Sequence, residues 1–288
     1  MFKNTFKTTI LLAAMGGLIV GVASVLGGGS SGAVMIGLVM ALVMVGGSYW
    51  FSDTLALKSA KARIITEADH PEFYGMVREL SQRAGLPMPR VAVSEAAQPN
   101  AFATGRGPNN AVVCATTGLL TSMTHEEVEG VMAHELMHVQ HRDILIGSVA
   151  AAVATAISSI AQMAMFASMF GGGRNDEDRP NPIAILMVSM LAPMAAGLIQ
   201  MAISRSREFE ADRGAAELIG NGESLARALE KIEQLAMRTP MQVAPAQAQA
   251  YIHNPLAGVP SRGVNMSKLF STHPATQERV RRLREMQF

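Results

Sequence analysis

The sequence predicts a membrane protein of the α+β class, in which four long apolar helices join a mainly helical domain that carries a small β-sheet. Composition is the first observation behind this prediction. Of the 288 residues, 49% are hydrophobic and only 16% are charged, whereas soluble domains are nearer a quarter charged. The net charge of +1 gives no argument for a nucleic-acid partner.

Four uncharged stretches are the second observation. Each has 19 residues or more, and about 20 residues cross a bilayer as a helix. They are Thr8–Leu26, Ala33–Phe51, Ile144–Phe170 and Ile183–Ser204. The first two are separated only by a short Gly/Ser turn and favour a transmembrane hairpin, with a cleaved signal peptide as the alternative. The last two are rich in Ala and also suit a membrane-associated or buried helical pair.

The distribution of basic residues predicts the orientation in the membrane. Basic side chains flank the stretches on one side, at Lys3, Lys7, Lys58, Lys61, Arg63, Arg142, Arg205 and Arg207. The opposite side carries an uncharged turn and the mixed-charge loop Gly171–Pro182. Flanks rich in Lys and Arg stay in the cytoplasm, so both termini and the polar domain are expected there. Tyr49 and Trp50 suit the role of interfacial anchors.

The polar segments supply the third observation, because they combine helical and strand patterns. Helices are expected at Pro71–Ala84, Glu208–Ile219, Ser224–Arg238 and Thr276–Met286, and short strands at Arg90–Ser94, Ala101–Thr104 and Ala111–Thr116. Thr239–Ser267, rich in Pro, Ala, Gln and Gly, is predicted to be a mobile loop, and autocleavage there is a hypothesis. The predicted organisation is an N-terminal hairpin (1–57), a first polar part (58–143), a second membrane pair (144–204) and a second polar part (205–288).

A metal motif lies in the segment Thr124–His141, which reads as one helix started by a capping box of Thr124 and Glu127. His134 and His138 are four residues apart, so their imidazoles share a helix face, as two zinc ligands require. Glu135 lies beside them, placed to activate a water. The alternative is a chance pair of surface histidines on a polar helix.

A third zinc ligand must come from elsewhere in the chain, because catalytic zinc commonly keeps three protein ligands and one water. Glu208 is the best candidate, and Asp212 follows on the same helix face, where it could accept a hydrogen bond from a zinc histidine. Spacing alone leaves open that both belong to a solvated acidic face. His141 is a rival, but it lies a further turn along the helix axis. Cys114 is the only cysteine, which excludes an intrachain disulfide and a thiolate cluster.

With these motifs, essentially the whole chain resembles the HtpX-type membrane zinc metalloproteases, which are similar to the CAAX prenyl endopeptidases. The resemblance implies a zincin-like domain with one zinc ion per chain, held by His134, His138 and Glu208, with Asp212 in support. It also implies that Asn100, Ala101, Phe102 and Ala103 form an edge strand to which a peptide substrate adds. The alternative for Phe102 is burial in the core. His273 and Arg279 match a motif of the same family that is thought to steady the oxyanion.

The function expected from this resemblance is that of an integral-membrane zinc endopeptidase in the inner membrane of a bacterium. Glu135 is expected to act as general base, and the substrates to be misfolded or damaged membrane proteins cut on the cytoplasmic side under stress. The bilayer and polypeptide substrates are thus the expected partners. The alternative is a non-catalytic membrane protein with structural zinc, but such sites are typically closed by four protein ligands. A transporter is disfavoured, because none of the four stretches contains an ionisable residue.

Overall fold

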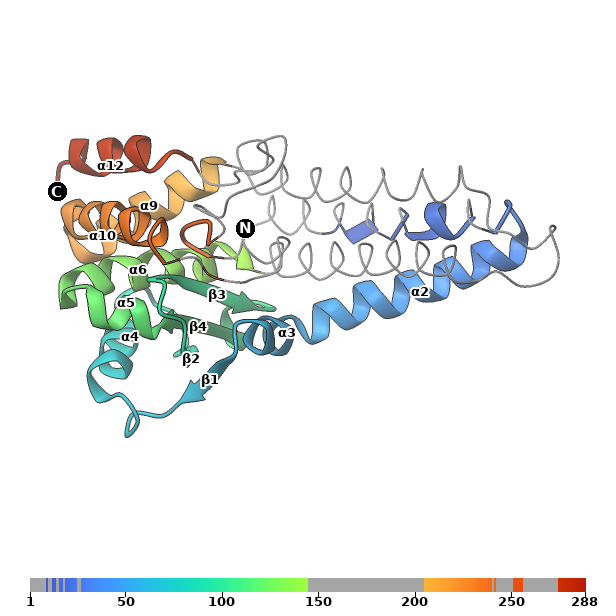
Figure 1. Cartoon of the computed structure of the whole chain (residues 1–288), viewed down its shortest axis with the longest axis horizontal. Coiled ribbons are helices and arrows are strands. Elements are labelled where there is room, and N and C mark those ends of the chain that lie inside the picture. The colour runs from blue at the N-terminus through green and yellow to red at the C-terminus, as the bar shows by residue number, and fades with distance from the viewer. Residues whose placement is uncertain are drawn as a thin grey trace.

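The computed structural model describes residues 9, 12–13, 16–17, 19–24, 27–144, 205–239, 241, 251–255 and 274–288. Its helices are α2 (Ser31–Trp50), α3 (Ser52–Ser59), α4 (Pro71–Arg83), α5 (Thr117–Ser122), α6 (His125–His141), α9 (Arg205–Ile219), α10 (Gly222–Ala236) and α12 (Thr276–Glu285), with a short 3₁₀ turn at Pro108–Asn110. Its strands are β1 (Ala62–Ile65), β2 (Arg90–Ser94), β3 (Ala101–Gly105) and β4 (Ala111–Thr116). Figure 1 shows α2 projecting from a body that holds the sheet and the other labelled helices.

The four strands form one mixed sheet in the order β1-β2-β4-β3. β1 pairs antiparallel with β2, β2 pairs parallel with β4, and β3 pairs antiparallel with β4. β3 is therefore an edge strand. In its register Ala101 lies opposite Ala115 and Gly105 opposite Ala111. Gly105 ends the strand at φ 127°, where a Cβ atom would lie only 2.1 Å from the Asn110 carbonyl oxygen.

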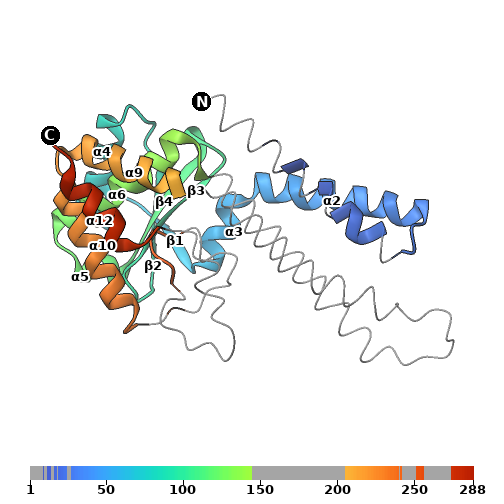
Figure 2. The same ribbon diagram turned by 90° about the horizontal axis from the view of Figure 1, so that it is seen from above.

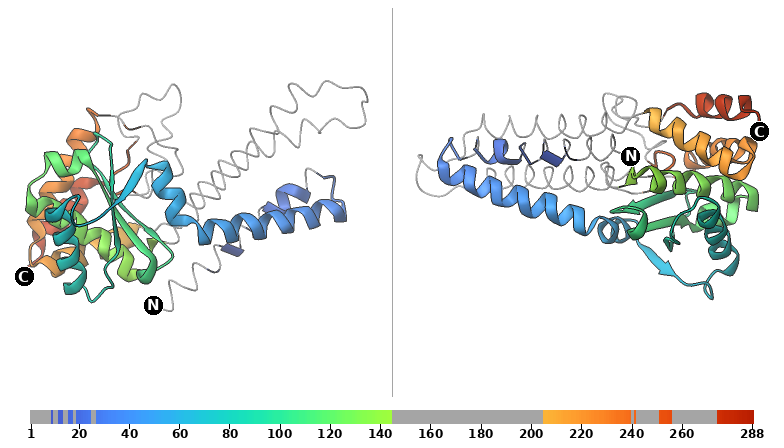
Figure 3. Two further views of the ribbon diagram at one scale, coloured as in Figure 1. Left: turned by 90° about the horizontal axis from the view of Figure 1, so that it is seen from below. Right: turned by 180° about the vertical axis from the view of Figure 1, so that it is seen from behind.

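Successive side chains of a strand point to opposite sides of the sheet, and β2, β3 and β4 are buried on both sides, whereas β1 is largely exposed. One face, which includes Val91, Ala103 and Val113, packs in the main core with side chains of α4, α6, α9 and α10. The other face, which includes Phe102 and Cys114, packs with Tyr251 and Ala60 in a smaller cluster. Figures 2 and 3 show α6, α9, α10 and α12 gathered together on the body, apart from α2.

α2 leaves many large apolar side chains exposed: Met35 and Ile36 are 62% and 61% exposed, and Leu42 and Val43 are both 67% exposed. In the described residues, no single helix is long and apolar enough to cross a membrane, but the bent pair Ser31–Gly47 and Ser52–Ser59, with 73° between its halves, could do so by length and composition. The predicted span Thr8–Leu26 is described only in part, Ile144–Phe170 is described only at Ile144, and Ile183–Ser204 lies wholly outside the described residues.

The polar elements agree with the predictions to within a few residues, including the ends of α4 at Gly85 and of α9 at Gly220, both with positive φ. Three short elements, α3, β1 and α5, were not predicted. The mobile-loop prediction for Thr239–Ser267 is wrong for residues 251–255, because Tyr251 and Ile252 are buried, at 3% and 2% exposure.

Candidate active site

Helix α6 begins with the predicted capping box: the Thr124 hydroxyl accepts the Glu127 N–H, and the Glu127 carboxylate accepts the Thr124 N–H. These bonds satisfy donors that every helix start leaves open. Glu127 is buried, and Lys231 of α10 donates to it at 2.7 Å. One turn after this anchored start, α6 enters the core, so His134 and Glu135 are 0% and 2% exposed.

Helix α9 crosses α6 closely enough to deliver a ligand from its first turn. Gly214 permits this approach, because a Cβ there would lie 2.8 Å from the Sδ atom of Met137 on α6. Glu208 and Asp212, one turn apart on α9, are both buried against α6, at 3% and 4% exposure. The alternative of a solvated acidic face therefore does not apply to these two side chains.

The three predicted ligands converge on one point. His134, His138 and Glu208 each offer a ligand atom within 4.8 Å of the others. The two Nε2 atoms are 3.1 Å apart, and the Glu208 carboxylate oxygens lie 3.8 Å from His134 Nε2 and 3.5 Å from His138 Nε2. Tetrahedral zinc with nitrogen and oxygen ligands at 2.0–2.2 Å separates its ligands by about 3.3–3.6 Å. The donor set and its spacing therefore fit a zinc ion.

A buried array of charges holds these ligands in place. His134 Nδ1 lies 2.9 Å from Asp212 Oδ1, which leaves Nε2 as the atom facing the ligand cluster. Arg279 of α12 donates to both oxygens of Asp212, at 2.6 and 2.8 Å, and lies 3.7 Å from Glu208. Asp143, just beyond α6, lies 3.6 Å from His138 Nδ1. The sequence did not single out Asp143, although its position one residue after the helix cap offered a signal.

Burial and neighbouring charges together set the protonation of these groups. Burial lowers the pKa of His134 to about 4, so its ring is neutral at pH 7, the form that binds metal. Burial raises the pKa of Glu135 to about 7, and the Glu208 carboxylate adds to this, while His138, Arg279 and a hydrogen bond from the Ala103 backbone oppose it. Burial alone would raise the pKa of Asp212, but the charge and hydrogen bonds of Arg279 hold it below its ordinary value.

The predicted edge strand lies beside this cluster, since the Ala103 backbone reaches Glu135. Phe102 points into the smaller apolar cluster, where its ring meets that of Tyr251 at 5.1 Å, so its side chain is core, as the alternative had it. Asn100 is fully buried, and its amide contacts the backbone of His253. His273 lies outside the described residues. Arg279 contacts the ligand array, as described above.

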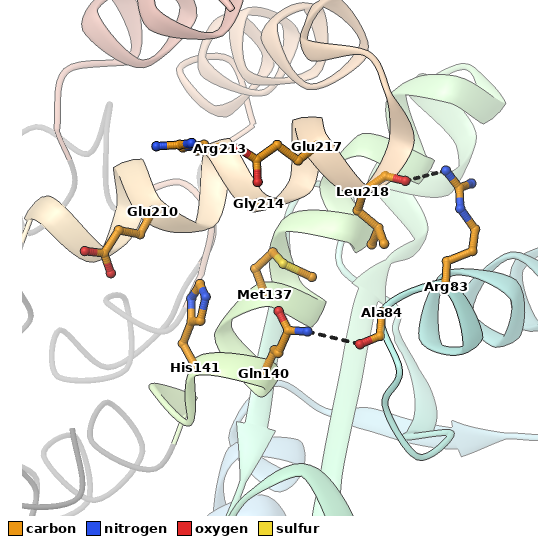
Figure 4. A pocket seen from close by; sticks show the side chains of 10 residues that line it. All are labelled: Arg83, Ala84, Met137, Gln140, His141, Glu210, Arg213, Gly214, Glu217 and Leu218. Carbon is orange, nitrogen blue, oxygen red and sulfur yellow. Dashed lines mark hydrogen bonds and ion pairs between the residues drawn. The ribbon is translucent and has the colours of Figure 1, made fainter. Parts of the chain in front are cut away.

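A separate cavity of about 450 Å³ opens between α6 and α9. Figure 4 shows Met137, Gln140 and His141 lining it from α6, and Glu210 and Glu217 from α9. Neither Glu135 nor any member of the ligand cluster lines it. His141 therefore faces a different space from His134 and His138, which agrees with its exclusion as a ligand.

Comparison with known proteins decides the family. The model of "Peptidase family M48" matches residues 67–287, which covers the polar domain and both histidines of the motif. This chain belongs to peptidase family M48. It is therefore a zinc metalloprotease with polypeptide substrates, and the predicted family resemblance is confirmed.

Relatives within the M48 family match over nearly the full chain. The chain is 52% identical to a "Protease HtpX homolog" of Polynucleobacter necessarius subsp. necessarius, covering 98% of this chain and 96% of the relative. It is 53% identical to a protein of the same description from Methylibium petroleiphilum, covering 98% of both. These homologues and the M48 assignment make this chain a membrane metalloprotease of the HtpX type.

A solved structure shares the fold. Ste24p of S. mikatae superimposes with a TM-score of 0.51 at 21% identity, covering 98% of this chain. The chain spans 65% of the length of Ste24p. The predicted α+β architecture, mainly helical with a small sheet, is thus confirmed as that of a membrane metalloprotease fold, apart from the number of spans.

Proposed function

We propose that this M48 protein is a multi-pass endopeptidase of a bacterial inner membrane that hydrolyses misfolded or damaged membrane proteins at their cytoplasmic side, as part of stress-linked quality control. The observation that carries the catalytic part is the convergence of His134, His138 and Glu208 within 4.8 Å, with Glu135 next to them. The membrane part is supported by the exposed apolar side chains of α2 and by the four uncharged stretches.

The site geometry supports the proposed ligand roles. His134, His138 and Glu208 would hold one zinc ion, which supplies a Lewis acid that polarises the scissile carbonyl and activates water. Asp212 keeps the proton of His134 on Nδ1, and Arg279 holds the Asp212 carboxylate in the orientation that does so. Of the residues within the described ranges, three donors converge, one fewer than a typical structural zinc site contains.

Glu135 is proposed to carry the proton through the reaction. Its carboxylate accepts a proton from the attacking water, whose oxygen bonds to the carbonyl carbon. The same carboxyl group then donates the proton to the amide nitrogen as the carbon–nitrogen bond breaks, leaving a carboxylate and an amine. A pKa raised to about 7 suits a group that must both accept and return a proton near neutral pH.

The chain organisation is proposed as predicted from the sequence: a hairpin (1–57), a first protease part (58–143), a second membrane pair (144–204) and a second protease part (205–288). The basic flanks support the proposal that the protease parts and both termini lie in the cytoplasm. Trp50 and Arg106 support a membrane surface at the base of α2, since the guanidinium lies 4.5 Å from the ring centroid. Arginine stacked on tryptophan is a pairing suited to this interface.

The test compares the detergent-purified wild-type protein with Glu135→Gln. About one zinc per chain in both proteins, with casein cleavage only in the wild type, is the expected result, because the amide cannot accept the proton. Glu126→Gln, on the exposed first turn of the same helix, is the matched control and should cleave like wild type. Cleavage by Glu135→Gln at the wild-type rate would refute the role of Glu135, and absence of zinc from both proteins would refute the metal site.

A further inference from the structure

Each histidine of the ligand cluster has a carboxylate on the far side of its ring. His134 Nδ1 lies 2.9 Å from Asp212, and His138 Nδ1 lies 3.6 Å from Asp143 Oδ2. The Nε2 atoms of both rings lie nearer the third candidate ligand, at 3.8 and 3.5 Å from the Glu208 oxygens. A neutral ring that binds metal through Nε2 carries its proton on Nδ1. For His138, Asp143 is the carboxylate beside that proton.

The end of α6 brings Asp143 to this position. The Asp143 N–H donates to the His138 carbonyl at 2.9 Å, and the Arg142 N–H donates to the Val139 carbonyl at 3.2 Å. These two bonds form the Schellman motif, which ends a helix and turns the chain back over its last turn. The backbone of Asp143 is therefore bonded to the same residue whose ring its carboxylate faces.

Arg142 adopts a backbone conformation that is unfavourable for its residue type. Its φ of 61° and ψ of 33° lie in the left-handed region, which glycine usually occupies at this position of a helix end. Within the described ranges, Lys61 and Arg142 are the non-glycine residues with positive φ. Strain of this kind is concentrated at functional sites. In α6 the strained residue fixes the position of Asp143.

Arg207 lies on the other side of the Asp143 carboxylate. Its Nη1 atom is 3.9 Å from Asp143 Oδ1, and the two side chains are only 9% and 7% exposed. A buried charge is costly unless an opposite charge lies close to it, so the pair favours this contact between the end of α6 and the start of α9. Arg207 directly precedes Glu208, and Asp143 faces His138, so the contact joins the surroundings of two candidate ligands.

We infer that Asp143 and Arg207 are positioning residues for zinc binding: Asp143 orients the ring of His138, and Arg207 orients Asp143. This inference rests on the proposed function, in which His138 is a zinc ligand. Arg279 and its carboxylate partner do the same for His134, so each histidine of the motif has a carboxylate and an arginine of its own. Retention of zinc thus depends on the junction of α6 and α9 as well as on α12.

The test measures zinc affinity for the full-length protein in detergent, by competition with a chromophoric chelator. Asp143→Asn should bind zinc about 10-fold more weakly than wild type, at the lower end of the range for such partners, because the 3.6 Å contact is longer than a formed hydrogen bond. Arg207→Gln should bind about 3- to 10-fold more weakly. The double variant should bind within about 2-fold of Asp143→Asn, because Arg207 acts through Asp143.

Arg205→Gln is the matched control, since it makes the same change at an exposed position in the same turn of α9, and it should alter zinc affinity less than about 2-fold. The visible absorption spectrum of the cobalt-loaded proteins gives a second measurement, because it reports the arrangement of the ligands. Asp143→Asn should shift this spectrum, and Arg205→Gln should not. A purely structural role of Asp143 would lower the denaturant midpoint of the metal-free protein and leave zinc affinity and the cobalt spectrum unchanged.

The possible outcomes separate this inference from the proposed function. Wild-type zinc affinity in Asp143→Asn, or losses that multiply fully in the double variant, would overturn the inference while leaving the zinc site intact. If Asp143→Asn does not fold, Arg207→Gln decides alone, and wild-type affinity in that variant would overturn the inference. A wild-type protein that binds no zinc would overturn both the inference and the proposed metal site.

Discussion

Asp212→Asn tests how strongly the buried charge array supports the metal site. Asp212 accepts from His134 Nδ1 at 2.9 Å and receives two bonds from Arg279, at 2.6 and 2.8 Å. The asparagine oxygen can still accept one hydrogen bond, but its amide N–H groups meet the guanidinium donors of Arg279, and the negative charge is lost. Both changes loosen the orientation and reduce the basicity of His134.

The expected loss of zinc affinity is about 10- to 100-fold, or about 1.4–2.8 kcal/mol, the range found when a partner of a metal-binding histidine is removed. The free energy of unfolding of the metal-free protein should also fall by about 1.5–3 kcal/mol, because the 2% exposed Arg279 loses its main acceptor. Zinc affinity is measured by competition with a chromophoric chelator, and stability by denaturant titration in detergent.

Glu217→Gln is the matched control on the same helix. Glu217 is exposed, and its carboxylate forms an ion pair with Arg213 at 2.7 Å. It should change zinc affinity less than about 2-fold, because surface ion pairs contribute little. An Asp212→Asn protein that binds zinc as tightly as wild type would refute the reasoning that Asp212 orients His134. A loss of affinity of the same size in Glu217→Gln would show a general effect of charge on α9.

The remaining predictions concern packing, reactivity and membrane depth. Gly75→Ala should stabilise the protein by about 0.5–1 kcal/mol, because the added Cβ would meet open space in the middle of α4. Gly130→Ala should destabilise it by about 1–3 kcal/mol, because the added Cβ would lie 2.8 Å from the Leu225 backbone nitrogen. Thermal melts that rank the two variants in the reverse order would contradict this. Cys114 is fully buried, and burial raises the pKa of its thiol, so intact-mass analysis should find no maleimide adduct until the protein is denatured. Trp50 is the single tryptophan and is 62% exposed. Its fluorescence in vesicles should be quenched more by lipids brominated near the headgroup than by lipids brominated at the chain ends. The opposite order would argue against an interfacial position.

Local chemistry explains what could be predicted from the sequence. The capping box of Thr124 and Glu127 and the four-residue spacing of His134 and His138 depend only on helix geometry, so α6 and two of the candidate ligands follow from the order of residues alone. Glu208 could not be distinguished from a solvated acid by spacing, and the family resemblance was needed. Its burial comes from the crossing of α6 and α9, which is a tertiary contact allowed by Gly214.

Non-local contacts explain what could not be predicted. β1 has the burial pattern intermediate, exposed, exposed, buried, so it lacks the alternation by which a strand is recognised. The strand order, with parallel pairing of β2 and β4, depends on connections that no local pattern encodes. Tyr251 and Ile252 lie in a segment whose composition suggested mobility, and they are ordered by Phe102, Ala101 and Arg279, which are distant in the chain.

The distribution of the site over α6, α9 and α12 has a consequence for biosynthesis. The motif histidines emerge from the ribosome well before Glu208, and Arg279 follows His134 by 145 residues, with the apolar stretches at 144–170 and 183–204 synthesised in between. A nascent chain that has exposed only α6 therefore holds two of the proposed ligands and the proposed proton acceptor but lacks the third proposed ligand and the guanidinium that contacts Asp212. Loops of this length close late, after the local helices have formed. Proteolytic competence is thus expected only after translation has passed both apolar stretches and reached Arg279.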